Sequence, residues 1–437
     1  MRILPFLLPL AACNAGGVVV VKDSTGNDPW GDADTDSDSD ADSDADADSD
    51  TDADSDADSD SDADVDAPPD EVVDCNGSGD FTTIQAAINA SVSGDRIGLM
   101  ACEYHETIDY LGKSIEVYGI EGSAKTEIDG DYAGTVVNIE TGEGGWTRLA
   151  GVTISDGYDP ADGAAIEIEY AVAELEDVVI DGSGDGMWQI RSSNGWVDAT
   201  DVTIKNSSIV AEGGAITVDG GSFTGLRITA DCGAGTVAFK DHNAVILTDS
   251  SFTCAGGYGI QNYHGELYLK RVRAEGGITG LYTYDEAGTE EEPDSPTERV
   301  TAYNSVFAGG SKGIDILYER LELYNSVVWG ADAALAMTLC NASSLAMNSV
   351  FMNSACGISG DQGFSSTYSA FYNNTADGCG VTVSPAVTTD PLFTAFPSDL
   401  TLAAGSPLKD AGSNGAAYKD VDGSRNDIGI TGGPWSP

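Results

Sequence analysis

A short apolar phrase recurs ten times along this chain, and its spacing limits the possible folds more than any other feature. It reads LAGVTI from Leu149 and LYNSVV from Leu323, and successive copies begin 21 to 33 residues apart. A period in the low twenties indicates one supersecondary unit stacked on itself. Apolar and outward-facing residues alternate within the phrase, so the unit contains strands. The copies begin at Leu149, Leu175, Ala199, Phe223, Leu247, Leu269, Ala302, Leu323, Ala346 and Thr367.

Most phrases are followed by a second, glycine-rich element, as in GGYGI from Gly256 and GGITGL from Gly276. Short strands, glycine turns and this coil length predict an all-β chain, a single-stranded right-handed parallel β-helix of about eleven coils. We place it over residues 71–387. Thr82 and Gln85 form a candidate capping box, which predicts a short N-terminal helix closing the lower edge of the stack.

The first residues predict export. Residues 1–12 have a charged start and an apolar run too short to span a bilayer, as in a signal peptide. The LAAC ending at Cys13 resembles a bacterial lipobox, which implies lipidation of Cys13 and an outer-membrane or cell-surface address, with residues 13–31 as the lipidated segment. A small-residue cysteine occurring by chance is the alternative.

An acidic segment follows, with aspartate at every even position from 32 to 66. These 18 aspartates supply a third of the net charge of −54. Neighbouring charges repel, and no apolar surface offsets chain entropy, so residues 32–70 are expected to form a disordered stalk. The segment lacks the glycine and glutamate of an EF-hand loop.

Seven further cysteines of an exported chain are candidates for disulfides. Cys75 flanks the first element together with Cys102, and the other two predicted pairs lie about one coil apart. The pairs are Cys75 with Cys102, Cys232 with Cys254, and Cys356 with Cys379, which leaves Cys340 over.

Both ends of the folded part resemble a known superfamily. GSGDFTTIQAAI from Gly77, GDRIGL from Gly94, Tyr104 and Glu106 are similar to the entry segment of pectin-lyase-like right-handed β-helix proteins, including pectinesterases. DPLF from Asp390 and the residues up to Gly429 resemble the C-terminal segment of secreted members. The resemblance implies the scaffold and leaves the reaction open.

The fifth phrase position should point outward, and it becomes apolar in the last copies, at Val306, Val327, Val350 and Phe371. Such a stripe is unusual on the surface of a monomer. Residues 388–437 are therefore expected to pack over it, with Leu392, Phe393 and Leu402 as contacts. At the third position, stacked Asp and Asn residues such as Asn304, Asn325 and Asn348 predict a hydrogen-bonded ladder.

One basic cluster is the candidate for catalysis. Counting from the phrases at Leu247 and Leu269 places His242 and His264 at the same point of adjacent coils, where stacked imidazoles could bind a metal or act as acid and base. Asp241, Asp285 and Glu286 could complete such a site, and a basic surface band is the alternative. The candidate catalytic residues are His242, His264, Lys270, Arg271 and Arg273, and the candidate sugar-stacking residues are Tyr263, Tyr282 and Tyr284.

A calcium site is a further hypothesis, because Asp420, Asp422 and Asp427 surround Gly423 with oxygen ligands; an Asp-Gly turn without metal is its alternative. The motifs of pectinesterases and polygalacturonases are missing or incomplete, and a net charge of −54 disfavours nucleic-acid binding.

Together these features predict a lipid-anchored monomer on the bacterial membrane, with a structural role or a polysaccharide or other surface component as partner. The alternative is a lyase or glycoside hydrolase acting on an acidic polysaccharide.

Overall fold

The computed structural model describes residues 68–437, except residue 146 and residues 160–162, 183–187, 207–213, 285–298, 339–343 and 361–363. The predicted signal peptide, Cys13, the stalk up to residue 67, Asp285, Glu286 and Cys340 all lie outside the described residues. The predicted end of the disordered stalk at residue 70 was wrong, because Asp70 N donates to Arg96 O at 2.9 Å and Arg96 N donates to the Asp70 carboxylate at 2.9 Å. Residues 69–437 belong to one compact unit. Among the described residues, no helix has the length and apolar character needed to cross a membrane.

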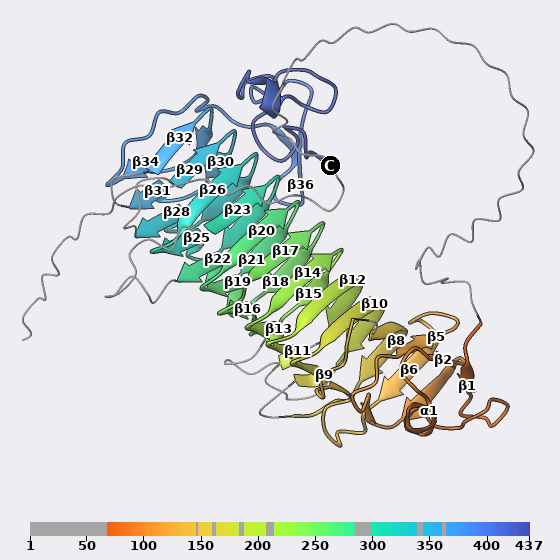
Figure 1. The fold of residues 1–437 in the computed structure, drawn as a ribbon. Helices are drawn as coiled ribbons and strands as arrows, with labels where there is room; N and C mark the ends of the chain where they lie inside the picture. The colour runs from red at the N-terminus through yellow and green to blue at the C-terminus, as the bar shows by residue number, and fades with distance from the viewer. Residues whose placement is uncertain are drawn as a thin grey trace, which may run out of the picture. The chain divides into compact units, whose positions relative to one another are not determined.

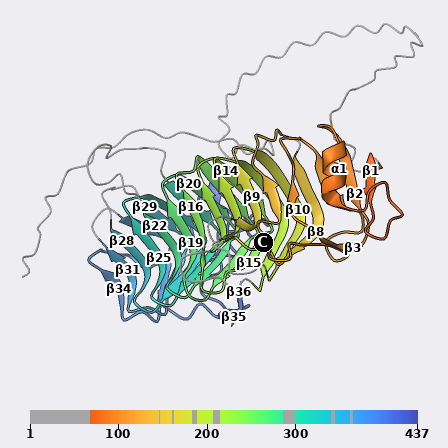
Figure 2. The same ribbon diagram turned by 90° about the horizontal axis from the view of Figure 1, so that it is seen from below.

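The unit is a right-handed parallel β-helix, as the repeat predicts (Figures 1 and 2). Each coil after the first contributes a strand to each of three parallel sheets. The first and second sheets are joined because three long strands, β8 (Arg148–Ser155), β10 (Val172–Asp181) and β12 (Trp196–Lys205), run through both. The third sheet has twelve strands, one more than the expected number of coils.

The strand bounds are as follows. The first sheet contains β1 (Glu71–Val73), β2 (Arg96–Leu99), β5 (Glu116–Gly119), β8 (Arg148–Ser155), β10 (Val172–Asp181), β12 (Trp196–Lys205), β14 (Ser222–Leu226), β17 (Ala244–Thr248), β20 (Glu266–Lys270), β23 (Arg299–Tyr303), β26 (Arg320–Tyr324), β29 (Ser344–Met347) and β32 (Phe364–Thr367). The second continues β8, β10 and β12 and adds β3 (Cys102–His105), β6 (Thr126–Asp129), β15 (Thr229–Asp231), β18 (Ser251–Cys254), β21 (Arg273–Gly276), β24 (Val306–Gly309), β27 (Val327–Gly330), β30 (Val350–Met352) and β33 (Ala370–Tyr372). The third contains β4 (Ile108–Asp109), β7 (Val137–Ile139), β9 (Gly163–Glu169), β11 (Trp188–Ser193), β13 (Gly214–Asp219), β16 (Thr236–Lys240), β19 (Tyr258–Tyr263), β22 (Thr279–Tyr284), β25 (Lys312–Leu317), β28 (Ala333–Thr338), β31 (Cys356–Gly360) and β34 (Ala376–Cys379).

The strand register tests the phrase boundaries. Eight of the ten predicted starts are paired with one another, from Leu149 to Ala346. The phrases at Phe223 and Thr367 were placed wrongly, because their register equivalents are Gly225 and Ser366. As a result, Phe371 points into the core and Ala370 takes the outward position.

The third phrase position forms the corner between the first two sheets. Asp177, Asp201, Asn304, Asn325 and Asn348 all have φ between 48° and 55°. Asp and Asn adopt this left-handed conformation more easily than most residues, which explains their recurrence. The predicted Asn ladder was wrong, because the side chains of Asn304, Asn325 and Asn348 bond to the C-terminal segment instead of to one another.

Serine forms the internal ladder instead, one position later. The Ser305 hydroxyl accepts a hydrogen bond from Val272 N at 3.1 Å, and that of Ser326 accepts from Ser305 N at 3.2 Å. Ser349 continues the series by accepting from Ser326 N. The backbone N–H groups of Val272, Ser305 and Ser326 are thereby satisfied inside the coil.

The predicted N-terminal helix is α1 (Ile84–Ala90), at one end of the stack (Figure 2). The Thr82–Gln85 capping box was wrong, since Thr83 is the N-cap residue and makes no side-chain cap. The Glu106 carboxylate caps the helix instead, accepting from Ile84 N at 2.7 Å and Gln85 N at 2.9 Å.

Glu106→Ala is therefore expected to lower the free energy of unfolding by about 0.5–2 kcal/mol, as loss of a helix cap does. Denaturant unfolding measures the change. Glu121→Ala, at an exposed glutamate, is the matched control. Equal losses in the two variants would contradict the capping role.

The C-terminal segment covers the apolar stripe, as predicted. Val306, Val327 and Val350 pack with Leu402, Leu408 and Ile428, and Phe393 lies against the same cluster. Leu392 was wrong as a contact, because its side chain is 43 % exposed. The segment contains β35 (Phe393–Ala395), β36 (Asp399–Leu402) and a 3₁₀ turn (Ala416–Tyr418).

Polar side chains fasten the same segment. The Asn304 amide donates to the carbonyl oxygens of Ile430 and Gly432 at 2.8 and 2.7 Å, and the Asn325 amide donates to Asp427 O at 2.9 Å. The three predicted disulfides are also confirmed, namely Cys75–Cys102, Cys232–Cys254 and Cys356–Cys379.

Candidate functional site

The two histidines of the predicted catalytic cluster do not stack. Lys240 of β16 pairs with Tyr263 of β19, so Asp241 lies opposite His264, and His264 Nδ1 is 2.9 Å from Asp241 Oδ1. The corner after β16 has three residues (241–243) and the corner after β19 has two (264–265). Counting from the phrases missed this extra residue, and the predicted alignment was wrong.

His242 turns into the coil and is only 4 % exposed. Its Nε2 is 2.7 Å from Asn262 Oδ1, and the amide of Asn262 reaches the buried Glu319 at 3.4 Å. Burial lowers the pKa of His242, outweighing the Asn262 hydrogen bond and the Asp241 charge. The imidazole is therefore neutral at pH 7.

The three remaining members of the cluster face different surfaces. The Lys270 ammonium lies 3.8 Å from the centroid of the Trp435 ring, on the first sheet. Arg271 forms a two-pronged ion pair with Asp249, at 2.5 and 2.7 Å, in the corner.

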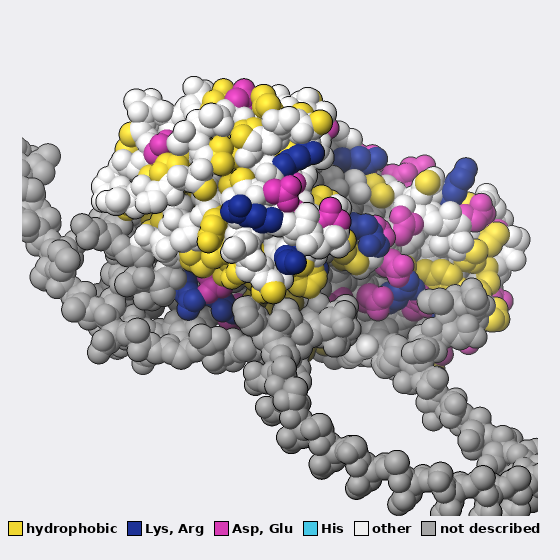
Figure 3. Space-filling view, turned by 90° about the horizontal axis from the view of Figure 1, so that it is seen from above, with side chains coloured by type: hydrophobic (Ala, Val, Ile, Leu, Met, Phe, Trp, Pro, Cys, Tyr) yellow, Lys and Arg dark blue, Asp and Glu magenta, His cyan; other side chains and the backbone are white. Residues whose placement is uncertain are grey.

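Arg273 is on the second sheet, where it pairs with Glu275 and donates to Pro397 O at 3.1 Å. Lys and Arg side chains also lie next to Asp and Glu on the face shown in Figure 3. The five predicted catalytic residues thus do not meet at one point.

The predicted sugar-stacking tyrosines do come together. Tyr263 of β19 pairs with Tyr284 of β22. Both side chains point outward, because the residue before each tyrosine is buried inside the coil. We define the tyrosine face as Tyr258, Tyr263, Tyr282, Tyr284 and Tyr318. Sequence reasoning missed Tyr258 and Tyr318, which lie outside the period-two alternation.

The rings of the tyrosine face form a continuous series. The centroids of Tyr258 and Tyr282 are 4.8 Å apart, and those of Tyr282 and Tyr263 are 6.3 Å apart. The series continues from Tyr263 to Tyr284 at 6.2 Å and from Tyr284 to Tyr318 at 6.4 Å. All five residues are partly exposed. Their rings therefore offer apolar surface to a ligand while holding one another in place.

Among the residues that the structure describes, charges at the edges of the tyrosine face are few and mixed. The Lys240 ammonium lies 5.9 Å from the Tyr263 centroid, and the Lys312 ammonium is 2.6 Å from Asp315. Burial, followed by the neighbouring Tyr263, raises the pKa of Tyr282 to about 12. This phenol stays neutral at physiological pH and keeps a hydroxyl that can donate and accept hydrogen bonds.

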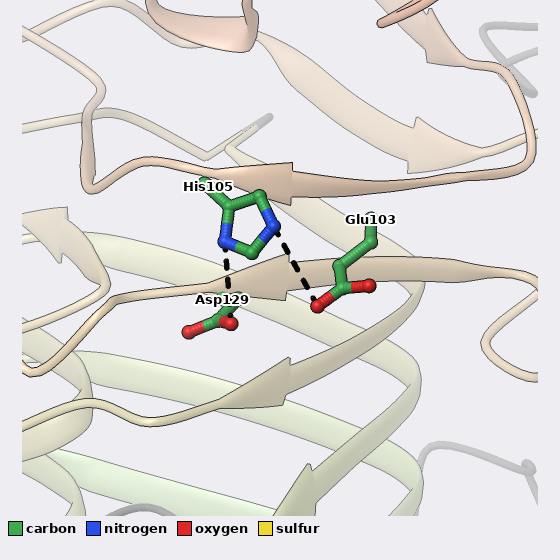
Figure 4. A group of neighbouring side chains, drawn as sticks. All are labelled: Glu103, His105 and Asp129. Carbon is green, nitrogen blue, oxygen red and sulfur yellow. Dashed lines mark ion pairs between the residues drawn. The ribbon is translucent and has the colours of Figure 1, made fainter.

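A second cluster lies on the second sheet, far from the predicted one in sequence. His105 Nδ1 is 3.3 Å from Asp129 Oδ2, and His105 Nε2 is 3.6 Å from Glu103 Oε1 (Figure 4). Among the described residues, these three are the group whose possible metal-ligand atoms lie within 4.8 Å of one another.

The imidazole of His105 stands between the two carboxylates, with one nitrogen toward each (Figure 4). Partial burial lowers the pKa of His105, but the charges of Asp131, Asp129 and Glu103 outweigh it and raise the pKa. The arrangement suits an ion pair with protonated His105, because a carboxylate oxygen lies within 3.6 Å of each ring nitrogen.

The predicted calcium ligands are engaged in backbone contacts. Asp420 accepts from Asp427 N at 3.1 Å and from Gly433 N, and Asp422 accepts from Ser424 N at 2.9 Å. Asp427 accepts from Asp410 N at 2.7 Å. Burial raises the pKa of both Asp420 and Asp427. This geometry favours a turn fastened by carboxylates.

Comparisons with known proteins add little. No family model and no curated protein matches the sequence. The solved structures similar to this chain include the pectate lyase Pel9A, at 13 % identity and a TM-score of 0.41, covering 80 % of this chain and 90 % of that one. They also include pectin methylesterase from carrot, at 14 % identity and a TM-score of 0.25, covering 74 % and 90 %. The activities in these names belong to those two proteins, and the fold of this chain rests on its own strand register.

Proposed function

We propose that this chain is a lipid-anchored cell-surface β-helix whose tyrosine face binds a polysaccharide. The observation that carries the proposal is the continuous series of partly exposed tyrosine rings on the third sheet. The C–H faces of sugar rings pack on aromatic rings, and sugar hydroxyls bond to phenols and amides beside them. A row of aromatic rings on a regular sheet suits a chain of repeating sugar units.

The proposed anchor to the membrane rests on the sequence. The lipobox-like LAAC at Cys13 would fix the chain to the membrane, and the acidic segment up to Asp66 would act as a spacer. At about 3.1–3.3 Å for each residue, such a spacer could reach ~110 Å, enough to present the β-helix away from the lipid surface.

Binding by the purified full-length chain tests the proposal, with mannan, β-1,3-glucan and polygalacturonate as probes. Wild type is expected to be retained by at least one of them. Tyr263→Ala with Tyr284→Ala is expected to weaken that binding about tenfold or more, as loss of two aromatic contacts does.

Tyr368→Ala is the matched control, because Tyr368 is 39 % exposed at the corner between the first and second sheets. Unchanged binding in the double variant would overturn the role of the tyrosine face. Unsaturated products or new reducing ends would instead establish the alternative, a lyase or hydrolase.

A further inference from the structure

A second set of exposed apolar side chains lies beside the corner between the third and first sheets. We call Tyr170, Val172 and Trp196 the aromatic patch; they are 67 %, 39 % and 61 % exposed. Val172 and Trp196 open neighbouring strands and pair in register. Trp196 N also donates to Ala171 O at 2.9 Å, which fixes its backbone against the preceding coil. Large side chains this exposed are typical of contact surfaces.

A column of outward residues on the third sheet leads to the tyrosine face from Ser193, which ends β11 just before the corner that leads to Trp196. Ser193 pairs with Asp219, Asp219 with Lys240, and Lys240 with Tyr263. These are three strand spacings, or about 14 Å along the axis of the coil. The intervening side chains are polar, and Asp219 and Lys240 are exposed. They can donate to or accept from the hydroxyls of a chain lying across them.

The corner beside this column is kept free of bulk. Gly220 has φ 74°, and a Cβ on Gly221 would lie 1.9 Å from the carbonyl oxygen of Gly195. Glycine is therefore required where the coil turns midway between the two sets of aromatic rings. Gly220 and Gly221 therefore carry no side chain that would lift a ligand off the surface at this corner, and the next corner carries the exposed, polar Asp241 and Asn243.

We propose that the aromatic patch and the tyrosine face are two contact points on one track, which binds a neutral polysaccharide running along the axis of the coil. This inference rests on the proposed function. A neutral chain is favoured because the protein carries a net charge of −54, so an anionic polymer meets repulsion, and because the exposed Asp219 and Lys240 of the track offset each other. Two contacts on one ligand also bind more tightly than either alone.

Ligand length tests the track. The probes are whichever of mannan and β-1,3-glucan is retained more tightly, its disaccharide, and polygalacturonate. Trp196→Ala is expected to weaken polymer binding about tenfold and to leave disaccharide binding unchanged. Ile246→Ala, at an exposed apolar side chain of the same sheet, is the control and is expected to change neither. A melting curve for each variant confirms folding.

The possible failures are distinguishable. Equal polymer affinity in Trp196→Ala and wild type would overturn the track and leave the tyrosine face intact. Tighter binding of polygalacturonate than of both neutral polymers would overturn the assignment to a neutral ligand. If no probe binds, the proposed function and the track fail together.

Discussion

Deletion of residues 388–437 is expected to make the β-helix self-associate and to lower its melting temperature. The deletion uncovers Val306, Val327 and Val350, which are at most 5 % exposed and pack against this segment. Burying one such side chain contributes about 1.5–3 kcal/mol, so the stripe loses several kcal/mol of burial. Light scattering and thermal melting measure the two effects. A truncated protein that stays monomeric with an unchanged melting temperature would contradict the covering role.

Two leucines of the segment test whether its packing against the stripe, and not only its presence, stabilises the fold. Leu408 is fully buried against the stripe, whereas Leu392 is 43 % exposed. Leu408→Ala is expected to cost about 2–5 kcal/mol, the usual range for a buried leucine. Leu392→Ala should cost far less, because it removes little buried surface. Similar losses in both would mean that the segment is not held by this cluster.

The repeat in the sequence predicted the architecture because the coil is built from short-range rules. Inward apolar residues at period two and a fixed coil length determine which strands are neighbours, and eight phrase starts paired as expected. The errors at Phe223 and Thr367 arose where an inward position holds a small residue. Gly225 and Ser366 occupy the first position of the phrase, which Leu149 occupies in its own copy. Because neither is a large apolar residue, the apolar pattern alone placed the start of these two phrases wrongly.

The candidate site was less predictable, since it depends on corners. One extra residue between β16 and β17 turned His242 inward and paired His264 with Asp241. No periodic pattern reports such an insertion. The tyrosines were found because Tyr263, Tyr282 and Tyr284 lie within strands, where alternation does fix direction. Glu106 belongs to the segment that resembles the superfamily, but no local sequence pattern predicts that it caps a helix more than 20 residues away.

The inward turn of His242 has a measurable consequence for pH dependence. Burial lowers the pKa of His242 below its usual 6.5, so the folded state keeps this imidazole neutral while the unfolded state takes up a proton. Stability contributed by neutral His242 is therefore complete above pH 6.5 and is lost as pH falls below 6.5 toward the folded pKa. The loss amounts to at most about 1.4 kcal/mol for each pH unit.

His242→Gln is expected to flatten the fall in unfolding free energy between pH 7 and pH 5, measured by denaturant unfolding at each pH. Glutamine cannot titrate but can still donate toward Asn262. His105→Gln provides a control of opposite sign, because the nearby carboxylates raise the pKa of His105. A raised pKa adds stability at low pH that disappears as pH rises through the folded pKa, so losing His105 should steepen the acid sensitivity. If the unfolding free energy of His242→Gln falls with pH as steeply as that of wild type, protonation of the buried imidazole does not cause the loss of stability in acid.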